Sequence, residues 1–313
     1  MIVLGLDTSN YTTSVAAFDG SSGNNVSRLL DVKSGELGLR QSDALFAHVK
    51  RLPELTETLC ASLQDRSVAA IGVSTRPREV EGSYMPCFLA GESQARVLGS
   101  ILGVPVIPVS HQQGHIAAAL WSAGRMDLMD RPFLAWHLSG GTTELLLVEP
   151  DGKNVRAQKI GGTNDISAGQ VIDRTGKLLG LAFPAGKQID ALAQKAAGKE
   201  AFRVKTKDLV FSLSGLENKM QEFYARTNSA EETAAFVLRS LISAVVRTTE
   251  NALAQYPCMP VVFSGGVASN SLLRDAAKRF DPVFAQPQYS TDNALGVAVL
   301  TWRLGDFDGT THT

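Results

Sequence analysis

The sequence predicts an α/β protein built from two similar lobes, and three observations point to this. Residues 3–19 and residues 133–149 have the same pattern: an apolar strand, a turn of small polar residues, and a second apolar strand. Other apolar strands alternate with stretches of helical periodicity. A chain of 313 residues is long enough to bury two cores. Two such lobes favour a cleft between them, where ligands usually bind.

The first lobe is expected to span residues 1–130. After the first hairpin, residues 28–32 predict a third strand. The spacing of five apolar residues predicts a helix over 41–60: Leu45, Phe46, Val49, Leu52 and Leu55. A buried strand follows at 69–75, a loop at 76–79, a helix at 89–102 and a strand at 104–109.

The second lobe is expected to span residues 131–313 and to open with the second hairpin. Helices are predicted at 168–179 and 187–195, with a turn at 184–186. Ser214 and Glu217 have the spacing of a capping box, which predicts a helix start at Ser214. A long helix covers 230–254, and a strand at 260–266 precedes a helix at 270–280. The last helix, at 293–304, is expected to pack back toward the cleft.

The bulk properties are typical of a soluble cytoplasmic protein. The net charge of −1 gives no global positive field that would indicate a nucleic-acid partner, although a local basic face stays possible. Three isolated cysteines argue against a disulfide framework and for a reducing compartment. No basic leader and no apolar stretch long enough to span a bilayer are present, so no membrane association is expected.

Two histidines follow directly on the strand that ends at Val109. Ser110 and Gln113 form a capping box, so a helix is predicted to begin here. His111 and His115 are then four residues apart on one helix face, a common metal half-site. The alternative is a pair of capped or core histidines, and the spacing alone leaves both possibilities open.

Glycine pairs follow two apolar strands, at Ser139-Gly140-Gly141 and at Ser264-Gly265-Gly266. Glycine lets backbone N–H groups approach an anion closely, so the two pairs, with the early turn at residues 7–9, favour phosphate binding. Each pair could also be an ordinary turn. Asp173 and Asp190, near Gly186, could bind ribose hydroxyls or could be surface acids. Asp292 could be a helix N-cap or a functional carboxylate.

Together these segments resemble one family, the tRNA threonylcarbamoyladenosine transferases, formerly called O-sialoglycoprotein endopeptidases or glycoproteases. The resemblance runs from Leu6 to Ala298. It rests on motifs in a specific order: His111-x-x-x-His115, Ser139-Gly140-Gly141, Asp173 through Lys177-Leu178-Leu179-Gly180-Leu181 to Pro184-Ala185-Gly186, Phe211-Ser212-Leu213-Ser214-Gly215-Leu216, Gly265-Gly266-Val267-Ala268-Ser269-Asn270 and Thr291-Asp292-Asn293. The resemblance implies the two-lobed fold of actin, sugar kinases and heat-shock chaperone ATPases, with duplicated ribonuclease H-like lobes.

The resemblance also implies site residues. His111, His115 and Asp292 match the family's ligands for one divalent metal ion, iron or zinc, and His137 falls where some relatives place a further ligand. Asp173, Gly186 and Asp190 match residues around the adenosine, and Asn270 matches another nucleotide contact. The loop that holds the nucleotide phosphate and the metal corresponds to His137, Leu138, Ser139, Gly140 and Gly141.

The implied reaction moves a threonylcarbamoyl group from threonylcarbamoyl-adenylate to the N6 amine of adenosine 37 in tRNA. The implied ligands are an adenine nucleotide or that adenylate, and the implied partners are tRNA, a homologous scaffold subunit and a small ATPase. An alternative is a non-catalytic nucleotide-binding subunit of a tRNA-modification complex. A metalloprotease is disfavoured because Gln112 stands where such enzymes carry a glutamate.

The chain departs from the family pattern in its first lobe. Tyr11 and Thr12 replace an acidic pair, and Arg76-Pro77-Arg78 replaces a Gly-Pro-Gly loop. In the second lobe Thr142 replaces a histidine or asparagine, and Glu217 replaces a basic residue. The metal and nucleotide motifs are retained, whereas the first-lobe face of the cleft, which should help to place the acceptor, is altered. Two alternatives therefore stay open: a divergent paralog with another acceptor, and a protein that binds nucleotide without transferring anything.

Overall fold

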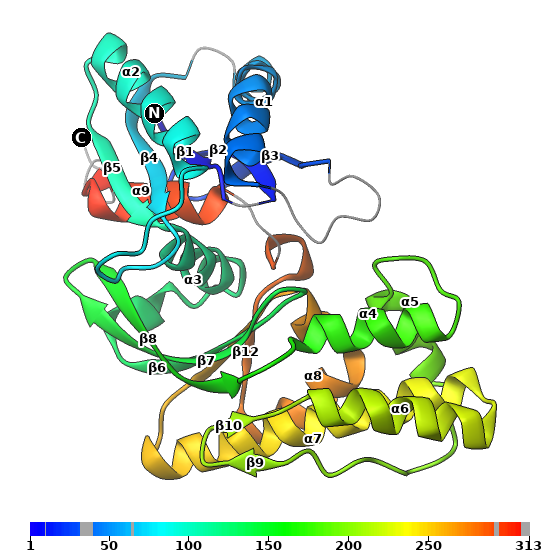
Figure 1. Ribbon diagram of the computed structural model, residues 1–313. Coiled ribbons are helices and arrows are strands. Elements are labelled where there is room, and N and C mark those ends of the chain that lie inside the picture. Colours follow the sequence, from blue (N-terminus) through cyan, green and yellow to red (C-terminus); the bar gives the residue numbers. More distant parts are fainter. Residues whose placement is uncertain (10, 32–39, 64–65, 291–293, 308–313) are drawn as a thin grey trace. The chain divides into compact units, whose positions relative to one another are not determined.

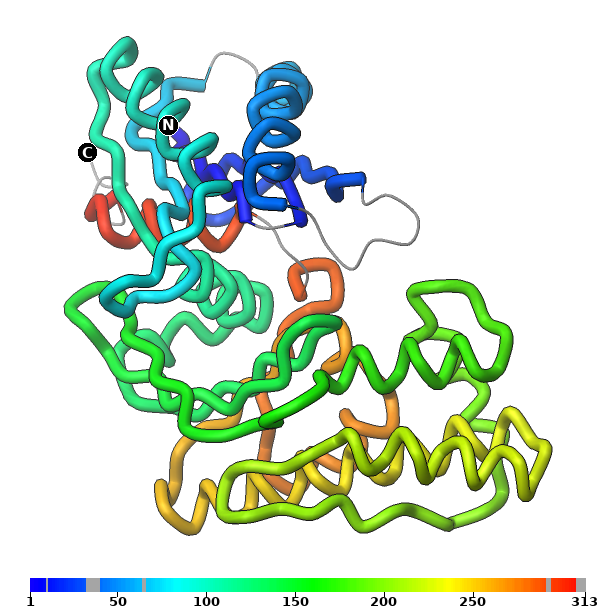
Figure 2. The backbone as a smooth tube through the Cα atoms, in the orientation of Figure 1, coloured from blue at the N-terminus to red at the C-terminus, as the bar shows by residue number. Residues whose placement is uncertain are grey.

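The protein is described from a computed structural model that covers residues 1–9, 11–31, 40–63, 66–290 and 294–307 (Figures 1 and 2). The chain divides into two compact units. The first comprises residues 1–131, 149–157 and 292–313, and the second comprises residues 132–148 and 158–291. The last helix of the described chain therefore belongs to the same unit as the first strand.

Within the described residues, the first unit contains a five-stranded sheet in the order β3-β2-β1-β4-β5. Its strands are β1 (Ile2–Asp7), β2 (Thr12–Phe18), β3 (Gly23–Leu29), β4 (Val68–Arg76) and β5 (Val106–Ser110). Its helices are α1 (Gln41–Ala61), α2 (Phe88–Leu102), α3 (His111–Ser122), the 3-10 turn η1 (Met126–Asp130) and α9 (Leu295–Leu304). β1, β2 and β3 are antiparallel neighbours, whereas β1, β4 and β5 run parallel.

The third strand differs from the prediction for residues 28–32, because β3 begins at Gly23. The reason is a tight turn after β2. The Asp19 carboxylate accepts hydrogen bonds from the backbone N–H groups of Ser21 and Ser22, at 3.0 and 2.7 Å. Gly20 takes a positive φ of 93°. This turn reverses the chain directly after β2. The first residues of β3 are polar, so the pattern of apolar residues does not indicate where the strand begins.

Helix α9 packs on the sheet of the first unit where two strands carry glycine. A Cβ atom on Gly5 of β1 would lie 2.5 Å from the carbonyl oxygen of Ala294, and one on Gly72 of β4 would lie 1.7 Å from Thr301 Oγ1. Only a residue without a side chain permits this approach. The glycines therefore set the depth at which α9 lies on β1 and β4.

The second unit contains a seven-stranded sheet, among the residues described, in the order β12-β11-β6-β7-β8-β10-β9. Its strands are β6 (Phe133–Leu138), β7 (Thr143–Asp151), β8 (Asn154–Thr163), β9 (Thr206–Lys207), β10 (Val210–Phe211), β11 (Val261–Ser264) and β12 (Val283–Phe284). Its helices are α4 (Ala168–Leu178), α5 (Gly186–Ala193), α6 (Ser214–Thr227), α7 (Ala230–Gln255) and α8 (Ser271–Ala277). Short 3-10 turns are η2 (Gly266–Ser269), η3 (Lys278–Phe280) and η4 (Pro287–Tyr289).

The two sheets repeat one topology, as the paired hairpins predict. In each, an antiparallel hairpin (β1–β2 or β6–β7) is flanked by the next strand on one side and by two parallel strands on the other. The order β3-β2-β1-β4-β5 thus corresponds to β8-β7-β6-β11-β12. The duplication predicted from residues 3–19 and 133–149 is confirmed at the level of topology.

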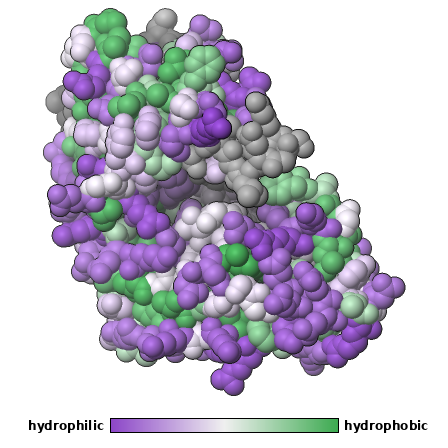
Figure 3. Space-filling model, in the orientation of Figure 1, coloured by the Kyte–Doolittle hydropathy of each residue, from purple (hydrophilic) through white to green (hydrophobic). Residues whose placement is uncertain are grey.

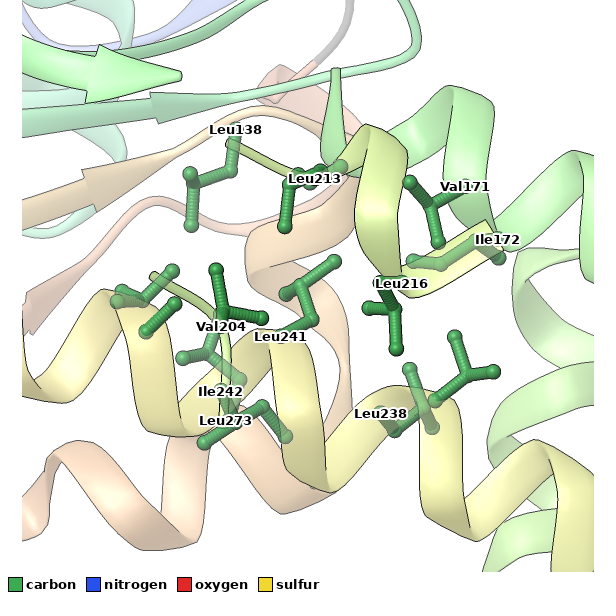
Figure 4. Close-up of a cluster of buried hydrophobic side chains, with 14 of the residues drawn as sticks. Leu138, Val171, Ile172, Val204, Leu213, Leu216, Leu238, Leu241, Ile242 and Leu273 are labelled. Carbon is green, nitrogen blue, oxygen red and sulfur yellow. The ribbon is translucent and has the colours of Figure 1, made fainter. Parts of the chain in front are cut away.

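The core of the second unit lies among its helices and the sheet. Figure 4 shows Leu213, which precedes α6, and Leu216 of α6 pointing toward Leu238 and Leu241 of α7, with Val171 of α4 beside them. All five side chains are at most 1% exposed. On the face seen in Figure 3, hydrophilic and hydrophobic residues are interspersed over this unit. No helix in the described part of the chain has the length and apolar character needed to cross a membrane.

Candidate functional site

Helix α3 begins with the capping box that the sequence predicts. Ser110 Oγ accepts a hydrogen bond from the Gln113 backbone N–H at 3.3 Å, and Gln113 Oε1 accepts from the Ser110 N–H at 2.8 Å. Gln113 Nε2 also donates to the carbonyl of Val155 at 2.8 Å. His111 is therefore the first residue of the helix, and His115 lies one turn further on the same face.

The two imidazoles of α3 converge. His111 Nε2 and His115 Nε2 are 2.9 Å apart, and the ring centroids are 4.3 Å apart. On its other side, His111 Nδ1 lies 2.7 Å from Asp7 Oδ2. When the Asp7 carboxylate is ionised it can only accept, so Nδ1–H of His111 donates to it. In the neutral form of that ring the lone pair is on Nε2, where it can accept from Nε2–H of His115.

This geometry fits a metal half-site. Two nitrogen ligands at about 2.1 Å from one ion lie about 3 Å apart when the angle at the metal is near 90°. A carboxylate behind a ligating histidine is the usual partner that fixes its tautomer. Metal binding would require His115 to give up or move its Nε2 proton. Among residues whose placement is described, no group of three or more His, Cys, Asp or Glu surrounds a common point. The third predicted ligand, Asp292, lies outside the described residues.

Asp7 contacts a predicted ligand, His111, and the residue spacing does not predict this link. The sequence favours phosphate binding at the turn of residues 7–9, but Asp7 is 1% exposed and Oδ1 accepts from the Ser9 N–H at 2.8 Å. Thr8 Oγ1 is also occupied, because it donates to the Cys87 carbonyl at 3.0 Å and accepts from the Gly91 N–H at 3.2 Å. The available signal was topological: β1 and β5 both run parallel to β4, so Asp7 and His111 end at one sheet edge.

Cys87 lies in this part of the first unit but is not suited to bind a metal as a thiolate. Burial, with the negative charge of Asp7 as a second cause, raises the pKa of the thiol to about 11. The thiol is therefore protonated near neutral pH, and the thiolate is the form that ligates metals. The two ring nitrogens on α3 are therefore better suited than Cys87 to bind a metal ion.

The loop that replaces Gly-Pro-Gly supports the same helix end. The Pro77 carbonyl accepts a hydrogen bond from the Gln112 N–H at 3.0 Å, which satisfies one free amide of the first turn of α3. The loop is closed by an ion pair in which Arg76 Nε donates to Glu79 Oε2 at 3.1 Å. Tyr11, where an acidic residue is usual, is 39% exposed, whereas Thr12 is buried at the start of β2.

In the second unit, the Ser139-Gly140-Gly141 turn is held by the start of α4. Ser167 Oγ donates to the Gly140 carbonyl at 2.5 Å, and the Gly169 N–H donates to the Ser139 carbonyl at 3.2 Å. A Cβ atom on Gly169 would lie 2.5 Å from Gly140 Cα. By contrast, a Cβ on Gly140 or Gly141 would meet no described atom within 4 Å. The start of α4 thus holds the turn on one side, while the Cβ positions of Gly140 and Gly141 border open space.

The second glycine pair continues this surface. Gly265 has a φ of 90°, and its Cβ position lies 2.2 Å from the Leu138 carbonyl oxygen, so only glycine fits there. Gly266 borders open space among the described residues. His137, on β6, is half-buried, and its Nδ1 lies 3.3 Å from Ser264 Oγ. The loop residues 137–141 and the pair at 265–266 therefore lie together at one edge of this sheet.

The predicted adenosine residues also gather in the second unit. Asp190 accepts hydrogen bonds from Asn270 Nδ2 at 3.0 Å and from Ser271 Oγ at 2.8 Å. Asp173 Oδ1 accepts from the Ala185 N–H at 3.0 Å, next to Gly186 at the start of α5. Asn270 Oδ1 is used as the N-cap of α8, accepting from the Leu273 N–H. The Asn270 amide thus bonds both Asp190 and the start of α8.

The predicted capping box at Ser214 is wrong. The N-cap position of α6 is Leu213, and Asp165, from the end of β8, takes the capping role. The backbone N–H groups of Leu213 and Ser214 donate to its carboxylate at 2.8 and 3.1 Å. Glu217 forms an ion pair with Arg174 instead of reaching back to the helix start.

Comparison with known proteins identifies the family. The sequence profile of TsaD, the tRNA N6-adenosine threonylcarbamoyltransferase family, matches residues 35–299. In structure the chain is similar to full-length HypF in its phosphate- and nucleotide-bound form, with a TM-score of 0.59 and 14% identity over 99% of this chain and 47% of HypF. The chain thus spans about half the length of HypF.

Two further solved structures are similar over almost their whole length. The (R)-2-hydroxyglutaryl-CoA dehydratase component A of Acidaminococcus fermentans has a TM-score of 0.57 at 14% identity, covering 98% of this chain and 99% of that protein. The ROK hexokinase of Thermus thermophilus has a TM-score of 0.55 at 17% identity, covering 99% and 100%. At such identities the likeness establishes the fold, that of actin, sugar kinases and heat-shock ATPases. The profile match spans most of the chain, and the protein belongs to the TsaD family.

Proposed function

We propose that this protein transfers a threonylcarbamoyl group from threonylcarbamoyl-adenylate to the N6 amine of adenosine 37 in tRNA. The observation that carries the proposal is the His111–His115 pair, whose Nε2 atoms are 2.9 Å apart with Asp7 behind them, in a chain of this family. A core or capping pair would not need a buried carboxylate that fixes one tautomer. The metal is taken to be iron or zinc.

In the proposed reaction the adenosine amine attacks the carbamoyl carbonyl carbon. A C–N bond forms, the bond from that carbon to the phosphate oxygen breaks, and AMP leaves with the electron pair while the amine loses a proton to solvent. A metal ion bound by His111, His115 and Asp292, with His137 as a predicted further ligand, would supply a Lewis acid. The chain's own task is to hold the adenylate in place.

The second unit carries the residues proposed for that task. The Ser139 N–H is used within the turn, where it donates to the Thr142 carbonyl at 2.8 Å. The proposed donors to the phosphate are therefore the N–H groups of Gly140 and Gly141, whose Cβ positions border open space. Asp173 and Asp190 are proposed to orient the adenosine, Asp190 in part by holding Asn270 at 3.0 Å. Because α4 fixes the turn before any ligand arrives, little reorganisation is needed on binding.

The test is a transfer assay with the full chain, tRNA transcript and threonylcarbamoyl-adenylate generated in place, with modified nucleosides quantified by mass spectrometry. The wild type should form threonylcarbamoyladenosine, and His111→Ala should not. The matched control is His312→Ala, which alters a histidine outside the predicted ligand set and should transfer like the wild type. Failure of the wild type with its metal and tRNA supplied would refute catalysis by this chain alone.

The altered residues Tyr11 and Thr12 favour one other candidate, a nucleotide-binding subunit without transferase activity. Thermal unfolding with ADP or AMP separates the two. Nucleotide should raise the melting temperature in both cases through mass action. A nucleotide-dependent rise in melting temperature, without any threonylcarbamoyl transfer even when the partner subunits implied by the resemblance are added, would support the non-catalytic subunit.

A further inference from the structure

His48 is a buried titratable residue of the first unit to which neither the predicted site nor the proposed reaction assigns a role. It lies on α1 and has no exposed surface. Its Nδ1 is 2.8 Å from Thr13 Oγ1 on β2. Burial lowers the pKa of the ring to about 4, although the Asp7 charge and the Ser9 backbone partly oppose this effect. The imidazole is therefore neutral near pH 7.

The ring is bound to one end of the turn that joins β1 to β2. Its Nδ1 bonds Thr13, just after the turn, whereas Nε2 is buried and has no hydrogen-bond partner among the described residues. The Ser9 backbone, just before the turn, lies close enough to raise the pKa of the ring. The Thr12 N–H also donates to the Ser9 carbonyl at 3.2 Å, so the turn is closed by the backbone as well. His48 is thus bound to the end of the turn from the helix side.

From this turn, hydrogen bonds lead to the α3 histidines. The Ser9 N–H donates to Asp7 Oδ1 at 2.8 Å. Asp7 Oδ2 accepts from His111 Nδ1 at 2.7 Å, and His111 Nε2 faces His115 Nε2 at 2.9 Å. Because Ser9 fixes one carboxylate oxygen, the position of the turn sets the position of the other. The rotation and tautomer of His111 depend on that second oxygen.

We propose that His48 is a positioning residue for His111, acting through the β1–β2 turn and the Asp7 carboxylate. It contacts neither His111 nor a metal ligand directly in any hydrogen bond of the described residues. Its contribution is to keep Asp7 in the one place from which it holds His111 with Nδ1 protonated and Nε2 unprotonated. The proposal rests on the metal site in the proposed function.

The competing explanation is that His48 only fills the core beside Thr13. Leu52, one turn further along α1 and 2% exposed, provides the matched control, because Leu52→Ala also removes buried volume from that helix face. If His48 acts through the turn, its replacement changes His111, and the replacement of Leu52 does not. If it only packs, both variants lower stability and leave His111 alone.

The experiment uses the full chain with His48→Phe, His48→Gln, Thr13→Val and Leu52→Ala. Zn2+ affinity is measured by competition with a chromophoric chelator, and ring nitrogen NMR of the metal-free protein reports the His111 tautomer. We expect about tenfold weaker Zn2+ binding and a mixed His111 tautomer in His48→Phe, in line with other outer-shell partners. His48→Gln, which can still bond Thr13, should recover most of the affinity.

Wild-type affinity and an unchanged His111 tautomer in His48→Phe would overturn the proposal, and so would an equal loss of affinity in Leu52→Ala. If His48→Phe does not fold, Thr13→Val decides, because it removes the hydroxyl with almost no change in shape. Wild-type Zn2+ affinity in Thr13→Val would then refute the role of the turn. None of these measurements uses the transfer reaction, so a failure of the proposed function, seen in the wild type with tRNA, is separate.

Discussion

The neutral state of His48 predicts how the stability of the first unit depends on pH. In an unfolded chain the ring has a pKa near 6.5, whereas burial lowers it to about 4 in the folded protein. Between these values the unfolded state binds the proton and the folded state does not. The contribution to stability is therefore complete above about pH 6.5 and is lost as the pH falls toward 4.

The size of the effect follows from the two pKa values. The interval from 6.5 to about 4, at about 1.4 kcal/mol for each pH unit, corresponds to about 3.5 kcal/mol at most. The free energy of unfolding of a typical domain is roughly 5–15 kcal/mol, so this contribution is a large part of it. The charges that influence the ring most are Asp7 on β1, which raises its pKa, and Arg51 on α1, which lowers it.

The assay is urea unfolding of the wild type and of His48→Gln between pH 7 and pH 4.5, followed by circular dichroism. Hydrogen exchange of β1 and β2 peptides assigns the change to the first unit. His48→Gln cannot titrate, so its unfolding free energy should depend less steeply on pH than that of the wild type. All other titrating groups are shared and cancel in the comparison. Parallel pH profiles of the two proteins would refute the reasoning.

Three other predictions follow from the geometry. His111→Ala should abolish Zn2+ binding in the chelator competition while the circular dichroism spectrum stays native; unchanged Zn2+ content would remove His111 from the ligand set. Gly169→Ala should displace the Ser139–Gly141 turn, because the new Cβ would lie 2.5 Å from Gly140 Cα, and should weaken AMP binding at least tenfold by calorimetry. The control Gly215→Ala meets only Phe202, at 3.9 Å, and should bind AMP like the wild type; equal binding by both variants would contradict the role of the turn. Asp165→Asn keeps one acceptor oxygen but cannot accept from both Leu213 and Ser214 as the charged carboxylate does, and it should cost about 1–2 kcal/mol in urea unfolding at pH 7. Burial raises the pKa of Asp165, but hydrogen bonds from Ser212, Leu213 and Ser214 outweigh this effect and hold the pKa below its usual range. The stability advantage of the wild type over Asp165→Asn should therefore shrink as the pH falls below about 4. A stability difference that does not change with pH would count against this cause.

The two capping boxes in the sequence show where local pattern is sufficient and where it is not. Ser110 and Gln113 form both expected hydrogen bonds, because the chain before Ser110 is a strand that delivers it to the helix start in extended conformation. Ser214 has the same spacing with Glu217, but Asp165 offers a charged acceptor to the same amides. A side chain 49 positions away in the sequence decides this helix start, and no local pattern reveals it.

The candidate site likewise contains one contact that the residue spacing predicts and one that it does not. The proximity of His111 and His115 follows from one helix turn and was predictable from spacing. The link to Asp7 depends on strand order, since β4 must lie between β1 and β5 for the two ends to meet. The duplicated hairpin predicted the repeated topology, but nothing local to residues 295–304 indicates that this helix belongs to the first unit.

That last assignment has a consequence for how the protein is made. Helix α9 lies against Gly5 and Gly72, yet the ribosome adds it only after all of residues 132–291. The apolar face of the first sheet therefore stays uncovered by α9 while the second unit is synthesised and can already fold. We expect chaperones that bind exposed β-strands to act on the beginning of this polypeptide during translation, and release to coincide with emergence of its last helix.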